Sequence, residues 1–488
     1  MLVSLYTVRV VLETLGVEDY GIYNVVAGVV TMFGFLSGAM ATASQRYFSF
    51  EIGRGDFEQL GKVFSLSVAI YVMIAVLVLL LAETIGLWFV SNKLVIPLER
   101  KEAVFWVYQF SIVSFLFTML TVPYMAMILA NEDMNIYAYV SIIEAVLKLS
   151  LVFVLQLTTR DKLALYGFLM LTVAVINTSI YRIICTKKYK VCKLKFYWNK
   201  DLFKEIAGYA GWSMFGSLSG IFKNQMVSIL LNQYFNPVVV AAKAVAMQIY
   251  GAVATFPQNF NSALKPQMIK TYAVGEKKKT LSLMFRGAKG TYLLMYLFTL
   301  PLMLEMPTVL GLWLKNPPEY AVLFTRLILA DILITSISYP IMTAVQATGK
   351  IGMYQSVVGG ILLLNVPVSW IALKMGAPAY SVLIVAICLA FVACGARLLI
   401  LKRLIDYSIR SFLKMVLVPI CVISIVSVIL PLTIYYHIEQ NILRLFVITA
   451  VSTISICFGS YFLGLNKAER CIVRSRVLEY ISAIRVKS

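Results

Sequence analysis

The chain has 488 residues, of which 60% are hydrophobic and only 14% are charged, with a net charge of +20. A typical soluble domain is about 45–50% apolar and about 25% charged. This composition therefore excludes a secreted enzyme, a disordered chain and a nucleic-acid-binding module, despite the positive charge. A membrane-spanning helix needs about 20 mostly apolar residues. The sequence therefore predicts an all-α polytopic membrane protein.

Apolar segments separated by short polar breaks predict about fourteen transmembrane helices. The breaks are short, so the chain has no space for a separate soluble domain. The predicted spans are 1–17, 21–45, 63–90, 103–130, 136–157, 163–185, 206–233, 238–264, 284–313, 321–348, 351–374, 378–402, 412–435 and 442–464.

Lys and Arg residues outside the spans are concentrated in the loops that follow even-numbered spans, above all in the linker 186–205. Positively charged loops stay on the cytoplasmic side of a membrane, so we expect both termini to be cytoplasmic. The C-terminal segment 465–488 has apolar residues at helical spacing and basic residues between them. This pattern predicts an amphipathic helix that lies on the lipid surface.

Two parts of the chain repeat one another. Gly-Leu-Trp occurs at 86–88 and again at 311–313, each time near the end of a predicted span. The next span in each part contains a proline, Pro123 or Pro340. Arg182 and Arg397 then mark the ends of the sixth and twelfth spans. Such self-similarity indicates an internal duplication.

The duplication predicts two six-helix lobes, 1–185 and 206–402, with two additional spans in 403–464 and the tail 465–488 after them. Parallel repeats are typical of alternating-access transporters, which bind their cargo near the middle of the membrane where the repeats meet. Aligned with the second copy, the first span lacks roughly a dozen residues, and its remaining 17 residues are barely enough for a crossing, which needs ~20. We therefore expect the natural start to lie upstream of Met1.

Charged and amide side chains inside the predicted spans are candidate binding residues, because a charge in lipid is costly unless it is paired or meets water. Lys223 lies near the middle of the seventh span, beside Asn224 and Gln225, and Arg9 lies in the repeat-related first span. Lys243 follows in the eighth span, where its long side chain could also extend toward water. We expect these cations to line a water-filled cavity, with a structural ion pair as the alternative.

Glu144 and Lys148 lie four residues apart on one face of the fifth span. They form either a self-neutralising structural bridge or a further part of the cavity. Pro123 and Pro340 interrupt equivalent spans, and a proline inside a spanning helix leaves a carbonyl without its usual donor. These two positions are predicted hinges.

Motifs of enzyme chemistry are missing from the sequence. The seven cysteines show no C-x-x-C spacing, the one histidine (His437) has no metal-binding pattern around it, and no phosphate-binding glycine loop occurs. We therefore expect no catalytic centre, no metal and no cofactor.

The string LGVEDYGIYN at 15–24 resembles a stretch of bacterial polysaccharide and O-antigen flippases, members of the multidrug/oligosaccharidyl-lipid/polysaccharide (MOP) exporter superfamily. Residues 47–48 (YF) with 53–56 (GRGD), and 347–350 (ATGK), are similar to further stretches of that family. The resemblance covers essentially the whole chain. It implies a V-shaped bundle like that of multidrug and toxin extrusion (MATE) transporters, located in the bacterial inner membrane.

The resemblance also implies a function, which is to move a polyprenyl-diphosphate-linked oligosaccharide to the outer leaflet for O-antigen, lipopolysaccharide or capsule synthesis. Basic residues of the cavity would hold the diphosphate, a role that Arg9, Lys223 and Lys243 fit by type and depth. A coupling ion, H⁺ or Na⁺, is a further expected partner. Two alternatives stay open: a cation-coupled multidrug exporter of the same fold, and a membrane-embedded polysaccharide polymerase or ligase.

Overall fold

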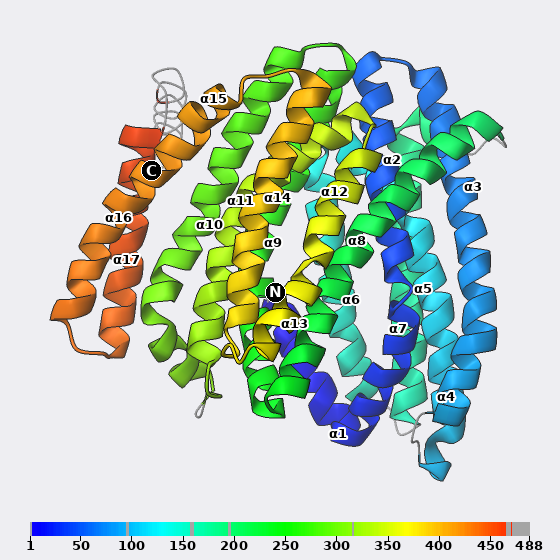
Figure 1. Ribbon diagram of the computed structural model, residues 1–488. Coiled ribbons are helices and arrows are strands. Elements are labelled where there is room, and N and C mark those ends of the chain that lie inside the picture. Colours follow the sequence, from blue (N-terminus) through cyan, green and yellow to red (C-terminus); the bar gives the residue numbers. More distant parts are fainter. Residues whose placement is uncertain are drawn as a thin grey trace, which may run out of the picture. The chain divides into compact units, whose positions relative to one another are not determined.

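The computed structural model describes residues 2–93, 97–156, 161–193, 197–314, 317–464 and 470. In this part of the chain the regular structure is helical throughout, without a strand (Figure 1). Eleven of its helices are long and apolar enough to cross a membrane. These observations confirm the predicted all-α, multi-pass membrane class.

Seventeen labelled helices occur in the described residues, and short π-helical segments at Ala82–Gly86, Leu413–Leu417 and Ser460–Gly464 continue some of them. The helices are α1 (Leu2–Thr31), α2 (Gly34–Arg54), α3 (Phe57–Leu81), α4 (Leu87–Lys93), α5 (Lys101–Ala130), α6 (Met134–Gln156), α7 (Lys162–Lys188), α8 (Lys200–Tyr234), α9 (Pro237–Ala273), α10 (Lys277–Trp313), α11 (Ala321–Thr348), α12 (Gly352–Leu363), α13 (Asn365–Lys374), α14 (Ser381–Ile405), α15 (Ile409–Phe412), α16 (Val418–His437) and α17 (Ile442–Gly459).

These helices follow the predicted spans closely except near the N-terminus. α1 is interrupted at Gly16, whose backbone (φ 82°, ψ 165°) lies in a region that glycine alone reaches easily. α2 begins only at Gly34, so the predicted span 21–45 is divided between two helices. Among the described residues, α1, α2 and α8 are not counted with the eleven helices that are long and apolar enough to cross a membrane.

The chain divides into two compact units. Unit 1 comprises Met1–Leu218 and Ile269–Glu276, and unit 2 comprises Ser219–Met268 and Lys277–Ser488. The boundaries of the predicted repeats, 1–185 and 206–402, stay a prediction. The predicted amphipathic tail 465–488 lies outside the described residues, apart from Arg470.

The core of unit 1 is built on the close contact between α5 and α7. Gly167 of α7 makes this approach possible, because a side chain at that position would come within 3.3 Å of the Val107 backbone. Inside the contact the Thr121 and Thr178 hydroxyls lie 2.7 Å apart. On another side of α5, the Tyr108 hydroxyl donates to the Ala82 carbonyl of the segment that follows α3 (2.7 Å). These three hydroxyl groups are thus paired within the protein, which favours a helix interface in lipid.

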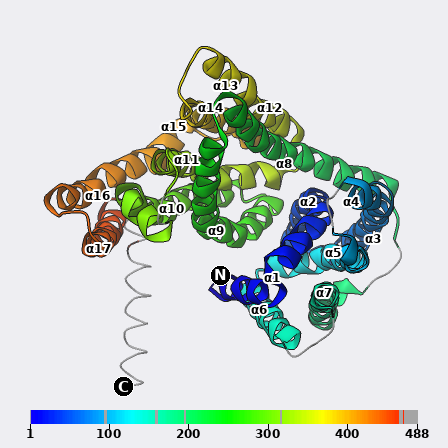
Figure 2. The same cartoon turned by 90° about the horizontal axis from the view of Figure 1, so that it is seen from below.

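Unit 2 is organised around α10, α11 and α14. Gly287 of α10 faces Pro340 of α11, and a side chain at Gly287 would lie 3.2 Å from the proline ring. The additional helices α16 and α17 lie side by side at one edge of this unit (Figure 1, Figure 2). α10 contacts both of them. The two spans outside the predicted repeat therefore form a hairpin that rests on α10.

Candidate functional site

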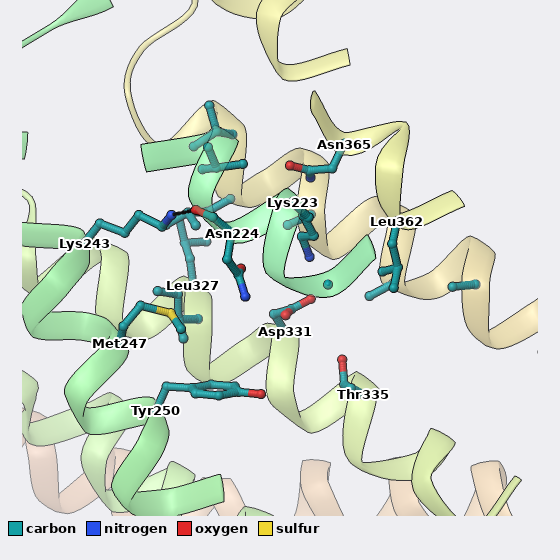
Figure 3. Close-up of a pocket in the computed structure, with 18 of the residues that line it drawn as sticks. Lys223, Asn224, Lys243, Met247, Tyr250, Leu327, Asp331, Thr335, Leu362 and Asn365 are labelled. Atoms are coloured by element: carbon teal, nitrogen blue, oxygen red, sulfur yellow. Dashed lines mark hydrogen bonds between the residues drawn. The ribbon is translucent and has the colours of Figure 1, made fainter. Parts of the chain in front are cut away.

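A polar cavity of about 190 Å³ lies inside unit 2. Six helices contribute to its wall, α8, α9, α11, α12, α13 and α14. Among its described lining residues are three cations, Lys223, Lys243 and Arg397, and a single carboxylate, Asp331. Figure 3 shows Lys223, Lys243 and Asp331. The cavity therefore carries an excess of positive charge.

Lys243 is the most buried of the three cations, with 5% of its surface exposed. Its ammonium group donates to the Asn224 carbonyl (2.7 Å) and to the Ser228 hydroxyl (2.8 Å), both on α8. The Lys243 side chain thus connects α9 to α8 through these two hydrogen bonds and is not directed toward the membrane surface. Its charge still faces the cavity, because both Lys243 and Asn224 line it.

Arg397 reaches the cavity from α14 and is held in place by two hydroxyl groups. Its Nε donates to the Tyr354 hydroxyl (3.1 Å) and its Nη1 donates to the Ser338 hydroxyl (3.2 Å). An arginine has five N–H donors in a planar fork. The two bonds therefore fix the orientation of the guanidinium and leave donors free for a ligand.

Lys223 and Asp331 are directed toward the same space from α8 and α11, with Thr335 one turn further along α11 (Figure 3). Within the part of the chain that the structure describes, the buried Asp331 Oδ1 atom has no hydrogen-bond partner, and the Lys223 ammonium faces this carboxylate across the cavity (Figure 3). An unpaired charge in a membrane protein requires water or a ligand. This half of the cavity is therefore open for binding.

Asn365, the first residue of α13, also lines the cavity. Its side chain is fully buried, and neither its Oδ1 nor its Nδ2 atom has a hydrogen-bond partner among the described residues. A buried amide without partners costs about 1–3 kcal/mol for each unsatisfied group. Asn365 therefore provides one donor and one acceptor that water or a bound molecule would satisfy.

The residues predicted from the sequence separate into three groups. Lys223, Asn224 and Lys243 line the cavity in unit 2. Gln225 is exposed and lies outside the cavity wall. Arg9 lies in α1, but its side chain is outside the described part of the structure. Roles for Gln225 and Arg9 stay a prediction.

Glu144 and Lys148 line a different cavity, which lies inside unit 1. Their charged atoms are 2.6 Å apart, and Asn177 of α7 donates to the second Glu144 oxygen (3.2 Å). The geometry is therefore compatible with both predicted roles of this pair, because Glu144 and Lys148 form a salt bridge and also line a cavity.

Four polar residues that line this cavity were not predicted from the sequence, namely Arg397, Asn365, Tyr250 and Thr335. A signal existed for Arg397, because it is a single charge within an otherwise apolar span, a feature that usually indicates function. No comparable signal marked the others, since Asn, Tyr and Thr are ordinary residues in spanning helices. Among the described residues, no three His, Cys, Asp or Glu side chains gather in a way that could hold a metal ion.

Comparison with known proteins places these features in a family context. The profile of the family described as "Polysaccharide biosynthesis protein" matches residues 1–271, which is more than half of the chain. A search of curated proteins finds no match.

Solved structures of transporters share the fold at low sequence identity. A MATE-family multidrug resistance transporter of the MOP superfamily, in its outward-facing conformation, superposes with a TM-score of 0.69 at 16% identity, covering 83% of this chain and 92% of the other. A MOP-superfamily transporter from Pyrococcus furiosus gives 0.69 at 14% identity, with coverages of 83% and 92%. The Vibrio cholerae MATE transporter VcmN, in its bent form, gives 0.64 at 16% identity, with coverages of 85% and 94%.

These matches agree with the predicted MATE-like bundle and with the resemblance in the sequence. The chain therefore belongs to the polysaccharide biosynthesis protein family and has the fold of MOP-superfamily transporters.

Proposed function

We propose that this protein flips a polyprenyl-diphosphate-linked oligosaccharide across the bacterial inner membrane by alternating access, for O-antigen, lipopolysaccharide or capsule synthesis. The observation that carries the proposal is the cavity in unit 2, with Lys223, Lys243 and Arg397 against the single carboxylate Asp331. Diphosphate is an anion that arginine and lysine bind by charge-assisted hydrogen bonds. Family membership supports a polysaccharide precursor as the source of that anion.

Each side chain of the cavity has a distinct part in this proposal. Arg397 is already oriented by Tyr354 and Ser338, so its remaining N–H groups can bind phosphate oxygens without a large entropy cost. Lys223 is free to follow the anion, because a lysine ammonium sits on a flexible stem. Asp331 keeps the empty site from carrying three uncompensated charges, and the Asn365 amide gains its missing partners on binding.

The alternative transport function, export of cationic drugs, fits the cavity less well. A cationic cargo needs unpaired carboxylates, whereas the described wall of this cavity has one carboxylate facing three cations. The Pyrococcus furiosus relative is itself described as having a binding pocket of reversed polarity that suggests a different function. A polymerase or ligase function has no supporting group of catalytic residues in this cavity.

Replacement of Lys223 by Ala tests the proposal. A charge-assisted hydrogen bond contributes about 1.5–3 kcal/mol, so we expect flipping of the lipid-linked oligosaccharide to fall roughly tenfold or more. The measurement is surface polysaccharide in cells and cargo translocation in proteoliposomes, with membrane protein levels determined in parallel. Lys204→Ala, an exposed lysine at the start of α8, is the matched control and should transport normally.

A double variant separates substrate binding from simple charge balance. If Lys223 only neutralises Asp331, the pair Lys223→Ala with Asp331→Asn should regain transport, because no unpaired carboxylate remains. If Lys223 binds the diphosphate, the double variant should stay inactive. Wild-type transport in Lys223→Ala at normal protein level would remove Lys223 from the site.

A further inference from the structure

The cavity in unit 1 has a chemistry different from that of the cavity in unit 2. It has a volume of about 250 Å³ and is enclosed by α5, α6 and α7. Its described wall contains one cation and one anion, Lys148 and Glu144, which neutralise each other at 2.6 Å. It therefore carries no net charge.

The charged pair of the cavity is partly exposed even though it lies in a membrane-spanning unit. Glu144 lies close to the middle of α6, and the side chains of Lys148 and Glu144 are 41% and 33% exposed. Exposure of charged groups to hydrocarbon at that depth would be strongly unfavourable, so such groups face water-filled cavities. A soluble ligand group can therefore reach this pair.

Polar groups without charge make up much of the remaining wall. The Thr118 and Ser141 hydroxyls donate to carbonyls one helical turn earlier, which leaves their oxygen lone pairs able to accept. Tyr181 brings a phenol group whose hydroxyl makes no hydrogen bond to another described residue, and apolar surface comes from Met170 and Val173. Such a mixture of apolar patches and a few well-placed polar groups is typical of small-molecule sites.

The hydrogen bonds around Glu144 determine which ligand suits the cavity. One carboxylate oxygen accepts from Lys148 and the other from Asn177, at 2.6 Å and 3.2 Å. A metal cation would have to displace an ammonium group from the single carboxylate in this wall. A phosphate would meet that carboxylate as a like charge. Neither kind of ion is favoured.

We propose that this cavity binds a neutral, hydroxyl-rich ligand, namely an uncharged sugar ring of the oligosaccharide cargo. The Glu144 carboxylate and the side-chain amide oxygen of Asn177 accept hydrogen bonds from sugar hydroxyls. The Lys148 ammonium and the Tyr181 hydroxyl donate hydrogen bonds to other sugar hydroxyls. The Met170 side chain contacts the apolar face of the ring. This inference rests on the proposed function for its cargo. It assigns the anionic and the neutral parts of that cargo to two separate cavities, one in each unit.

The experiment uses the full chain purified into lipid nanodiscs, with glucose, galactose, rhamnose and N-acetylglucosamine as probes. Saturation-transfer NMR should detect at least one of these sugars on the wild-type protein, with millimolar affinity. Asn177→Ala should weaken that binding roughly tenfold, as expected for a lost hydrogen bond of about 1.5 kcal/mol. The charge-neutral double variant Glu144→Leu with Lys148→Leu should abolish it.

Two control variants keep the outcome specific to the cavity. Thr172→Val lies on the same helix as Asn177, but its hydroxyl bonds to the Phe168 carbonyl outside the cavity, so sugar binding should be unchanged. Lys223→Ala should also leave sugar binding unchanged. If none of the four sugars binds, or if Asn177→Ala has no effect on their binding, the sugar site is wrong.

A sodium titration and a pyrophosphate titration complete the test. Sodium binding that Glu144→Leu with Lys148→Leu removes would overturn the proposal in favour of a cation site. Pyrophosphate binding that Lys223→Ala weakens, in a protein that binds no sugar, would refute this inference and leave the proposed function standing. If the protein binds sugar but does not bind pyrophosphate, the result would support the sugar site in unit 1 and contradict the proposed diphosphate site in unit 2.

Discussion

Residues of one type have different uses in this protein according to their neighbours. Lys243 has its ammonium bound to α8, whereas the Lys223 ammonium faces Asp331 and the open cavity (Figure 3). From the sequence both are lysines inside a predicted span, and both were predicted to support binding. The structure gives them separate tasks, because a lysine with two hydrogen bonds fixes a helix contact and a lysine without them remains available to a ligand.

Asp133 provides a residue-scale prediction at the turn between α5 and α6. Burial raises the pKa of its carboxyl, but a hydrogen bond from the Lys188 ammonium (2.7 Å) and one from the Tyr189 hydroxyl outweigh burial, so the pKa lies below its ordinary value. A carboxyl with a lowered pKa stabilises the fold above its unfolded pKa, about 3.9 for Asp. This stabilisation is lost as the pH falls through the folded value.

Asp133→Asn should therefore lower the unfolding midpoint at pH 7, and the difference from wild type should shrink below about pH 4. The contribution is modest, about 1 kcal/mol or less, since the pair is partly exposed to solvent. Thermal unfolding in detergent at the two pH values measures it. Asp201→Asn, at an exposed position at the start of α8, is the control. A difference that persists unchanged at pH 3 would contradict the assignment.

At the scale of elements, the predicted hinge Pro340 has a feature that Pro123 does not show. A proline leaves the carbonyl four residues earlier without its helical donor, which for Pro340 is Ser336. The Thr291 hydroxyl of α10 donates to that carbonyl at 3.0 Å. The bend is thus satisfied from a neighbouring helix. Whether either proline acts as a hinge stays a prediction.

The hairpin of α16 and α17 is attached to α10 by buried charges. Glu305 is fully buried and its carboxylate lies 2.7 Å from Arg444 of α17, while Thr308 donates to the same carboxylate (2.6 Å). Near the other end of the hairpin, the Lys289 ammonium of α10 donates to the Gly464 carbonyl. These contacts fix the hairpin to unit 2.

Arg444→Met should destabilise the protein strongly, by about 3–5 kcal/mol, because it leaves the buried Glu305 charge without its partner. Thermal unfolding in detergent should show a clearly lower midpoint. Arg403→Met, an exposed position near the end of α14, should leave the midpoint nearly unchanged. Adding Glu305→Leu to Arg444→Met should restore much of the stability, since no unpaired charge then remains. An unchanged midpoint in Arg444→Met would show that the pair contributes little.

At the scale of the whole molecule, the distribution of Lys and Arg predicts the orientation in the membrane. Lys350 follows α11, at a loop predicted to be cytoplasmic, and Met375 follows α13, at a loop predicted to be external. Both positions are exposed. They flank one predicted span, so they should lie on opposite sides of the membrane.

Labelling of single cysteines tests this orientation. In a version whose native cysteines are replaced by serine, Met375→Cys should react with a membrane-impermeant thiol reagent added to intact spheroplasts. Lys350→Cys should react only after the membrane is opened. The reverse pattern would show that positive residues do not set the orientation here.

Much of the fold could be predicted from sequence because it depends on local properties. Length and apolar content of each segment determine whether it spans lipid, and twelve of the fourteen predicted spans, from 63–90 onward, match helices of the structure closely. The break at Gly16 lies at the end of the predicted first span, 1–17, whereas the separate start of α2 at Gly34, inside the predicted span 21–45, was not predicted. The apolar pattern continues across residues 31–34, and only the backbone geometry reveals the separate start of α2.

From the sequence alone it follows that this protein is a helical, multi-pass membrane protein, and Lys223 and Lys243 are predicted as cations of a cavity. The folded molecule adds that Arg397 and Asn365 join these lysines, while Glu144 and Lys148 line a separate cavity with Asn177. The physical reason is that the rotation of each helix about its axis depends on packing between segments distant in the chain. That rotation, which hydropathy does not encode, determines which polar side chains meet.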